Sequence, residues 1–187
     1  MSCSSNCCNH QAHAQKFIRQ AQPQHLVLAG SCCNVRGMLG AAPRVTVLGA
    51  QVEGLASLAL DCKQERVRVI ATSAPSLSLS RDPADIVYLC ENVSTLTARD
   101  FAELAAVLKP GGAFLLSARF SQGELPREDW PGVKDLGHWL STLREAGFAR
   151  VEFLAESVLI FSCGEDGQLI YSVSEGLLKA TKEESTC

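Results

Sequence analysis

The stretch that decides the fold is ADIVYLCENVSTLTARDFAELAAVLKPGGAFLLSARF, residues 84–120. It begins and ends on continuous apolar runs, 84–91 and 112–120, which are typical of strands covered on both faces. Between them, Thr97 and Asp100 have the spacing of an N-terminal helix-capping signal. The apolar residues that follow fall on one helical stripe, formed by Phe101, Leu104, Ala105 and Leu108. The stretch therefore predicts a strand, a helix and a second strand.

The flanking sequence continues the alternation of apolar runs and helical stripes. Further strands are expected at residues 25–30, 44–50, 66–73, 149–156, 157–163 and 168–174. Asp135 is the expected cap of a second helix that ends near Gly147, and Asp166-Gly167 marks a tight turn between the last two strands. The pattern predicts an α/β fold with a doubly wound, mostly parallel, Rossmann-like sheet and a C-terminal antiparallel hairpin.

Length and charge narrow the class of protein. The 187 residues fit one domain, expected at residues 25–176 between a flexible, Cys-rich tail at 1–24 and a frayed tail at 177–187. The net charge is −3 and no Lys/Arg run is present, so we expect neither a nucleic-acid partner nor a membrane. No signal core and no apolar run of about 20 residues occurs, which indicates a cytoplasmic protein.

Nine cysteines, an odd number, occur without a secretory signal, so reduced thiols are expected. The N-terminal segment gathers soft metal ligands, namely Cys3, Cys7, Cys8, His10 and His13. Their spacing matches no familiar zinc or iron–sulfur site. A disordered Cys-rich tail is the favoured interpretation, a short helix around Gln11–Ala21 is the alternative, and metal binding there stays open.

Residues 84–117 resemble the middle of class I S-adenosylmethionine-dependent methyltransferases. The Asp85-led run, the helix after it and LKPGGAFLLS at 108–117 are similar to that family's fourth strand, following helix and fifth strand. Gly147-Phe148 resembles its approach to the sixth strand. The resemblance implies a methyltransferase-like topology over residues 25–174, with a cofactor site after the first, second and fourth strands.

The cofactor-binding half departs from that family's pattern. Gly30 is present after the first strand, but Ser31 and then Cys32, Cys33 and Asn34 stand where the family has a Gly-rich loop. Glycines there let the backbone approach a ligand without a Cβ clash. After the second strand, Gln51 replaces the usual acidic residue, and Glu53 comes two residues later. Gly30, Ser31, Gln51 and Glu91 are therefore the candidate cofactor-binding residues of a vestigial site.

This combination is similar in character to the N-terminal domain of anamorsins, cytosolic iron–sulfur assembly proteins with a methyltransferase-like fold. The similarity lies in VLKPGG at 107–112 and in the degraded first half. It implies a non-catalytic module with a protein partner, no catalytic residue and no cofactor. The cluster-binding Cys motifs of anamorsins, C-x-C or C-x-x-C, are absent from this sequence. The alternative hypothesis is an active methyltransferase of unknown substrate that uses S-adenosylmethionine.

Overall fold

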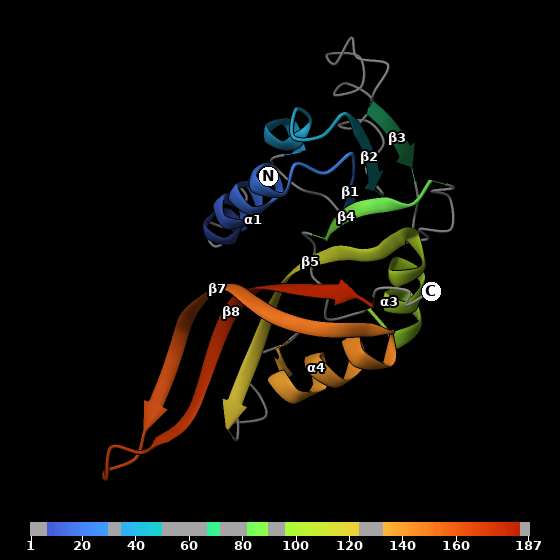
Figure 1. The fold of residues 1–187 in the computed structure, drawn as a ribbon. Helices are drawn as coiled ribbons and strands as arrows, with labels where there is room; N and C mark the ends of the chain where they lie inside the picture. The colour runs from blue at the N-terminus through green and yellow to red at the C-terminus, as the bar shows by residue number, and fades with distance from the viewer. Residues whose placement is uncertain are drawn as a thin grey trace.

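The computed structural model describes residues 7–29, 35–49, 67–71, 82–89, 96–123 and 133–183. Its strands form one sheet in the order β3-β2-β1-β4-β5-β8-β7, with the short β6 paired to β5 (Figure 1). The strands are β1 His25–Ala29, β2 Arg44–Gly49, β3 Val67–Ala71, β4 Ala84–Leu89, β5 Leu108–Gly123, β6 Lys134–Asp135, β7 Phe148–Cys163 and β8 Leu169–Lys182. The first five strands pair in parallel, and β8 runs antiparallel to both β5 and β7. The predicted fold class is confirmed.

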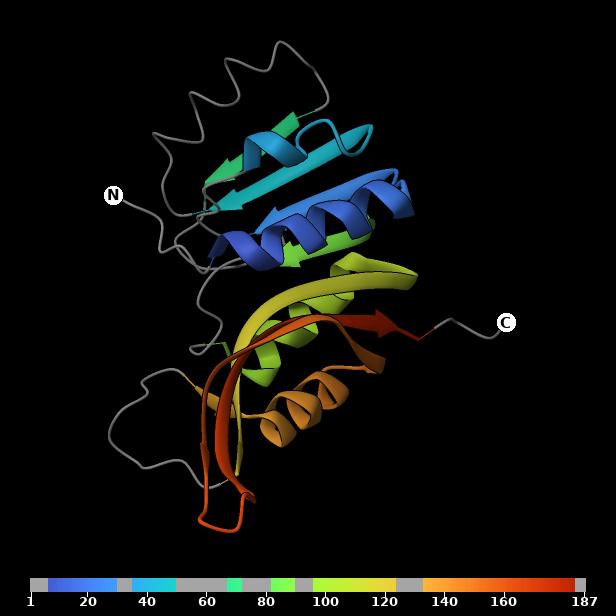
Figure 2. The same cartoon turned by 90° about the vertical axis from the view of Figure 1, so that its left-hand side faces the viewer.

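Helices cover both faces of the sheet. They are α1 Cys7–Ala21, α3 Ala98–Val107 and α4 Leu136–Glu145, together with the 3₁₀ turn η1 Val35–Met38. Figures 1 and 2 show α1 on one face of the sheet, with α3 and α4 on the other. Each face has its own apolar core. Ile18 of α1 packs with Leu28, whereas Phe101 of α3 packs with Phe114 and Trp139.

The predicted helix signals are confirmed. Asp100 Oδ2 accepts from the Thr97 backbone N–H at 2.7 Å, and Thr97 Oγ1 accepts from the Asp100 N–H at 3.4 Å, so α3 begins with a capping box. The Asp135 carboxylate caps α4 by accepting from the Gly137 N–H at 2.7 Å. Gly147 follows α4 with a φ of +91°, a conformation that favours glycine.

The N-terminal segment differs from the expected flexible tail over residues 1–24. Cys7–Ala21 form a helix of 15 residues whose Ala14 and Ile18 are fully buried. These residues lie four apart, so they share one face and dock it on the sheet. Most of the remaining α1 side chains are polar, which is why the composition of the segment suggested a tail.

The C-terminal end also differs from expectation. β7 is one continuous strand of 16 residues where two separate strands were expected. β8 continues to Lys182, through the segment expected to fray from residue 177. Leu178 is fully buried because it lies opposite Leu116 of β5 and Phe153 of β7. Pairing on both sides holds this segment in the sheet.

Candidate functional site

The carboxyl ends of the parallel strands meet at one edge of the sheet. Ala29 at the end of β1 lies opposite Leu48 of β2 on one side and Leu89 of β4 on the other. The strand order reverses between β1 and β4, because β2 and β3 continue on the far side of β1. Ligands of open α/β sheets bind outside such a switch point, so this edge is the candidate site.

The four candidate cofactor-binding residues follow these strand ends in sequence. Gly30 and Ser31 come directly after β1, Gln51 comes two residues after β2, and Glu91 comes two residues after β4. All four lie outside the described residues, as do Cys32, Cys33, Asn34 and Glu53. The structure places the ends of β1, β2 and β4 side by side, and the candidate residues follow these ends in sequence.

The chemistry of the strand ends can be compared with the needs of an S-adenosyl ligand. The resemblance implies an acidic side chain at the end of the second strand, where it would bind the ribose hydroxyls. The last residues of β1, β2 and β4 are Ala29, Gly49 and Leu89, and none carries a polar side chain. The side chains that the resemblance assigns to cofactor binding follow these strand ends, outside the described residues.

A charged cluster lies close to the same edge, on the face covered by α1. Leu116 of β5 lies opposite Leu89, the last residue of β4. Arg119 comes three residues after Leu116 in the same strand. Its Nε lies 3.7 Å from Glu175 Oε1 of β8, and His10 Nε2 of α1 lies 3.9 Å from Glu175 Oε2. The cluster therefore joins α1, β5 and β8 beyond the end of β4.

The His10 ring in this cluster is buried, with 3% exposure, and neither ring nitrogen makes a hydrogen bond. Burial lowers the pKa of the imidazole below its ordinary value of 6.5, although the nearby Glu175 carboxylate acts in the opposite direction. A neutral His10 at pH 7 follows. The buried ring lies beside Glu175 of β8, so His10 contributes to docking α1 on the sheet. No group of three or more His, Cys, Asp or Glu side chains in the described ranges has a metal-binding arrangement.

A second polar cluster lies at the opposite, amino end of the sheet. Asp85 Oδ2 accepts from the backbone N–H groups of Gln24 at 2.8 Å and His25 at 2.7 Å, while Lys109 Nζ donates to Oδ1 at 2.6 Å. Burial by itself raises the pKa of Asp85. The Lys109 ammonium and the two backbone donors outweigh burial and hold the pKa below 3.8. The Asp85 carboxylate therefore fastens β4 to the starts of β1 and β5.

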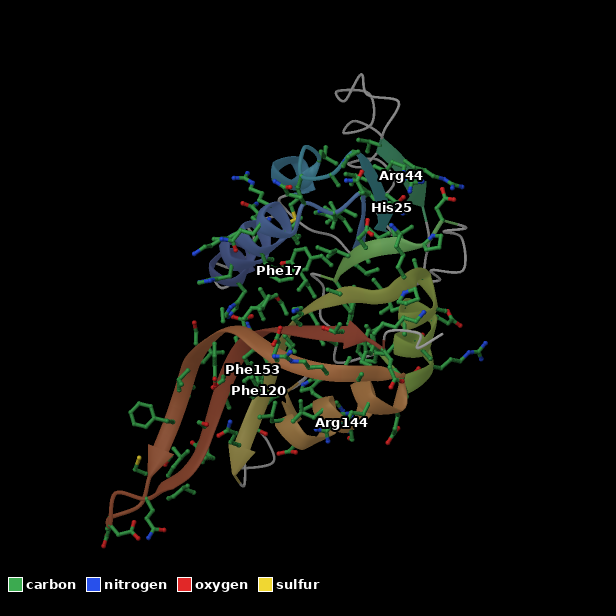
Figure 3. The ribbon with its side chains drawn as sticks, viewed as in Figure 1. Phe17, His25, Arg44, Phe120, Arg144 and Phe153 are labelled. Atoms are coloured by element: carbon green, nitrogen blue, oxygen red, sulfur yellow. The ribbon has the colours of Figure 1, made fainter. Side chains whose placement is uncertain are left out.

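His25 belongs to this amino-end cluster and not to the candidate site. It is the first residue of β1 and 3% exposed, and Figure 3 shows it beside Arg44 at the start of the strands. Its Nδ1 donates to the Pro83 carbonyl oxygen at 3.2 Å, and Nε2 lies 3.0 Å from Thr46 Oγ1. Both ring nitrogens are satisfied, so His25 has a structural role.

Sequence reasoning did not identify Arg119 and Glu175. Each occupies an alternating position in a long strand, where a single charge is typical of a solvated face. Nothing local marks Glu175 as the partner of a histidine at the opposite end of the chain. The fold alone brings them together.

Comparisons with known proteins agree on the fold. No family model and no curated protein matches the sequence. Among solved structures, the YcgJ protein from Bacillus subtilis has a TM-score of 0.69 at 18% identity, over 94% of this chain and 100% of that one. The N-methyltransferase NodS from Bradyrhizobium japonicum has a TM-score of 0.62 at 13% identity, over 96% of this chain and 99% of that one. The [4+2]-cyclase SpnF has a TM-score of 0.58 at 15% identity, over 92% of this chain and 80% of that one.

These similarities and the strand order agree on the fold. The chain has the fold of class I S-adenosylmethionine-dependent methyltransferases, with five parallel strands followed by an antiparallel pair. NodS has also been solved in complex with S-adenosyl-l-homocysteine, at 13% identity to this chain. None of the helices in the described ranges is both long and apolar enough to cross a membrane.

Proposed function

We propose that the chain is a non-catalytic methyltransferase-like module that acts through protein contacts. The observation that supports this most is the apolar end of β2. A carboxylate that binds ribose hydroxyls is expected there, and the strand ends at Gly49, followed in sequence by Ala50 and Gln51. Without that carboxylate, the sugar hydroxyls of an adenosyl ligand would lose water without gaining a charged acceptor.

The sequence after β1 supports the same proposal. Only Gly30 remains of the expected Gly-rich loop, and residues 31–34 all carry side chains. Each added Cβ restricts how closely a backbone can approach a bound ligand. The loss of glycines and the loss of the acid affect different strands, so they are independent reasons to expect weak or no binding of the cofactor.

The more specific version of the proposal is a role like that of the anamorsin N-terminal domain, in cytosolic iron–sulfur assembly. Its support is the resemblance of residues 107–112 and of the degraded first half. In this version the module recruits a protein partner, and any cluster would be held by that partner.

A second candidate is an active S-adenosylmethionine-dependent methyltransferase with an unusual cofactor loop. It is favoured by the complete strand order and by the N-methyltransferase NodS, which has the same fold and has been solved with S-adenosyl-l-homocysteine. The fold does not decide between the candidates, since another neighbour with this fold is named a [4+2]-cyclase.

Isothermal titration with S-adenosylmethionine and S-adenosyl-l-homocysteine separates the two candidates. The first predicts no saturable heat at millimolar ligand, and a micromolar dissociation constant rejects it. If binding is found, Gly30→Trp provides the matched variant. Loss of binding with an unchanged thermal unfolding midpoint supports the second candidate, whereas unchanged affinity places the ligand away from the loop after β1 and contradicts that candidate.

A further inference from the structure

The contact between α1 and β8 holds an imidazole and a carboxylate that are largely buried and not hydrogen-bonded to each other. Both ring nitrogens of His10 are without a hydrogen-bond partner among the described residues, and the residue is 3% exposed. The Glu175 side chain is 14% exposed, and its two oxygens lie 3.9 Å from His10 Nε2 and 3.7 Å from Arg119 Nε. Both distances exceed that of a hydrogen bond. Since buried polar groups are normally satisfied, a further partner is expected between them.

A bridging metal ion accounts for the separation of the imidazole and the carboxylate. Zinc binds imidazole nitrogen and carboxylate oxygen at about 2.0–2.2 Å, so two such ligands of a tetrahedral ion lie about 3.4 Å apart. The Nε2-to-Oε2 distance of 3.9 Å needs a shift of only about 0.5 Å to hold the ion. Burial lowers the pKa of His10 and so favours the neutral imidazole, which is the form that binds metal.

The periodicity of α1 places a third metal-binding residue on the same stripe of the helix. The stripe that faces the sheet is marked by the buried residues His10, Gln11, Ala14 and Ile18. Cys7 is the first residue of α1, three before His10 and seven before Ala14, so it belongs to this stripe. Cysteine and histidine are the usual ligands of zinc in proteins. One turn of α1 therefore contributes two residues of the kind that zinc prefers.

The charges of these groups match a divalent ion. A Cys7 thiolate and the Glu175 carboxylate together balance Zn²⁺, so the site as a whole is neutral, which suits a largely buried position. Arg119 lies on the other oxygen of the Glu175 carboxylate and orients it, as outer-shell partners of metal ligands do. Lys179, the next cation along β8, is paired with Glu152 at 2.6 Å. A mixed set of thiolate, imidazole and carboxylate favours zinc over Mg²⁺ or Ca²⁺.

We propose that His10, Glu175 and Cys7 form a zinc site that fastens the first turn of α1 to β8 and leaves a fourth position for water. His10 and Glu175 are the ligands whose side chains are described, so the described ranges hold a pair and not a group of three. The spacing of the N-terminal cysteines and histidines does not match a familiar site because one ligand comes from the opposite end of the chain. The site goes beyond the proposed function and does not depend on it.

Titration of the metal-free 187-residue chain with Co²⁺ and then Zn²⁺, under reducing conditions, tests the site. Co²⁺ is expected to bind at one ion per chain, with the d–d bands of a tetrahedral ion and a thiolate-to-cobalt charge-transfer band. Zn²⁺ should displace it with a dissociation constant of about 1 µM or lower. Zn²⁺ should also raise the thermal unfolding midpoint, because it binds the folded chain. A chain that gives no cobalt spectrum overturns the proposal.

Single substitutions assign the ligands. His10→Leu, Cys7→Ser and Glu175→Gln should each raise the zinc dissociation constant by about a hundredfold or more, because each removes one ligand. Cys163→Ser and His138→Gln are the matched controls, since they remove an exposed thiol and an exposed imidazole, and they should keep the wild-type affinity. Circular dichroism of the metal-free proteins checks that each variant is folded. Zinc binding that survives both His10→Leu and Glu175→Gln would place the ion on the N-terminal cysteines alone and overturn the site.

Discussion

Removing the Asp85 carboxylate should weaken the amino end of the sheet by a predictable amount. The side chain is 27% exposed and accepts three hydrogen bonds, two from backbone N–H groups and one from Lys109. Hydrogen bonds to a charged group contribute about 1.5–3 kcal/mol each when shielded from water. The Lys109 ammonium is 39% exposed and regains water, so its bond contributes about 0–1 kcal/mol. Since Gln24 is also exposed, Asp85→Ala should lower the free energy of unfolding by about 2–4 kcal/mol.

The pH dependence gives this prediction its sharper form. The folded-state pKa of Asp85 lies below its ordinary value of 3.8, so its contribution is complete above that value and is lost as the pH falls through the folded-state pKa. Urea unfolding at neutral and acidic pH measures this. The difference between wild type and Asp85→Ala should be largest at neutral pH and shrink in acid. A difference below about 0.5 kcal/mol at neutral pH, or one that does not shrink, would refute the role assigned to the carboxylate.

Three further substitutions test other parts of the structure. Because the pKa of His10 is lowered, its contribution to stability is complete above pH 6.5 and decreases as the pH falls below that value. In urea titrations, the free energy of unfolding of His10→Leu should therefore decrease less with falling pH than that of the wild type. Equal decreases in the two proteins would contradict this prediction. Gly176→Ala would place a methyl group 2.9 Å from Phe120 and 3.2 Å from Phe153. Because these two rings are in mutual contact (Figure 3), overpacking should lower the free energy of unfolding by about 1–3 kcal/mol. An unchanged melting temperature would contradict this prediction. Thr97→Ala should cost about 1 kcal/mol by removing the α3 cap, while Thr97→Ser keeps the hydroxyl and should stay near wild type in the same melting experiment.

The parts of the fold that were predictable are those with dense local signals. The capping pair Thr97 and Asp100, and the buried stripe that begins at Phe101, place α3 from sequence alone. Parallel pairing of β1, β2 and β4 follows from the alternation of strands with helical connections. The same alternation predicts that Gly30, Gln51 and Glu91 follow the carboxyl ends of these strands, and this stays a prediction because the three residues lie outside the described ranges.

The parts that were missed depend on contacts between distant segments. A helix around Gln11–Ala21 was one of two alternatives for the N-terminal segment, and α1 contains it. Its place in the core was not predicted, because it depends on docking of Ala14 and Ile18 onto the sheet. The end of β8 has no strong alternation, and it is held because Leu178 pairs on both sides. The contact between His10 and Glu175 likewise exists only once α1 and β8 are brought together.

The most direct test of a non-catalytic domain is an amide NMR titration with S-adenosyl-l-homocysteine. Ala29, Leu48 and Leu89 lie in register at the carboxyl edge where the cofactor would bind. Their amide resonances are predicted to stay unchanged up to millimolar ligand. Saturable shifts of these resonances with a micromolar dissociation constant would show an occupied cofactor site and contradict the proposed function.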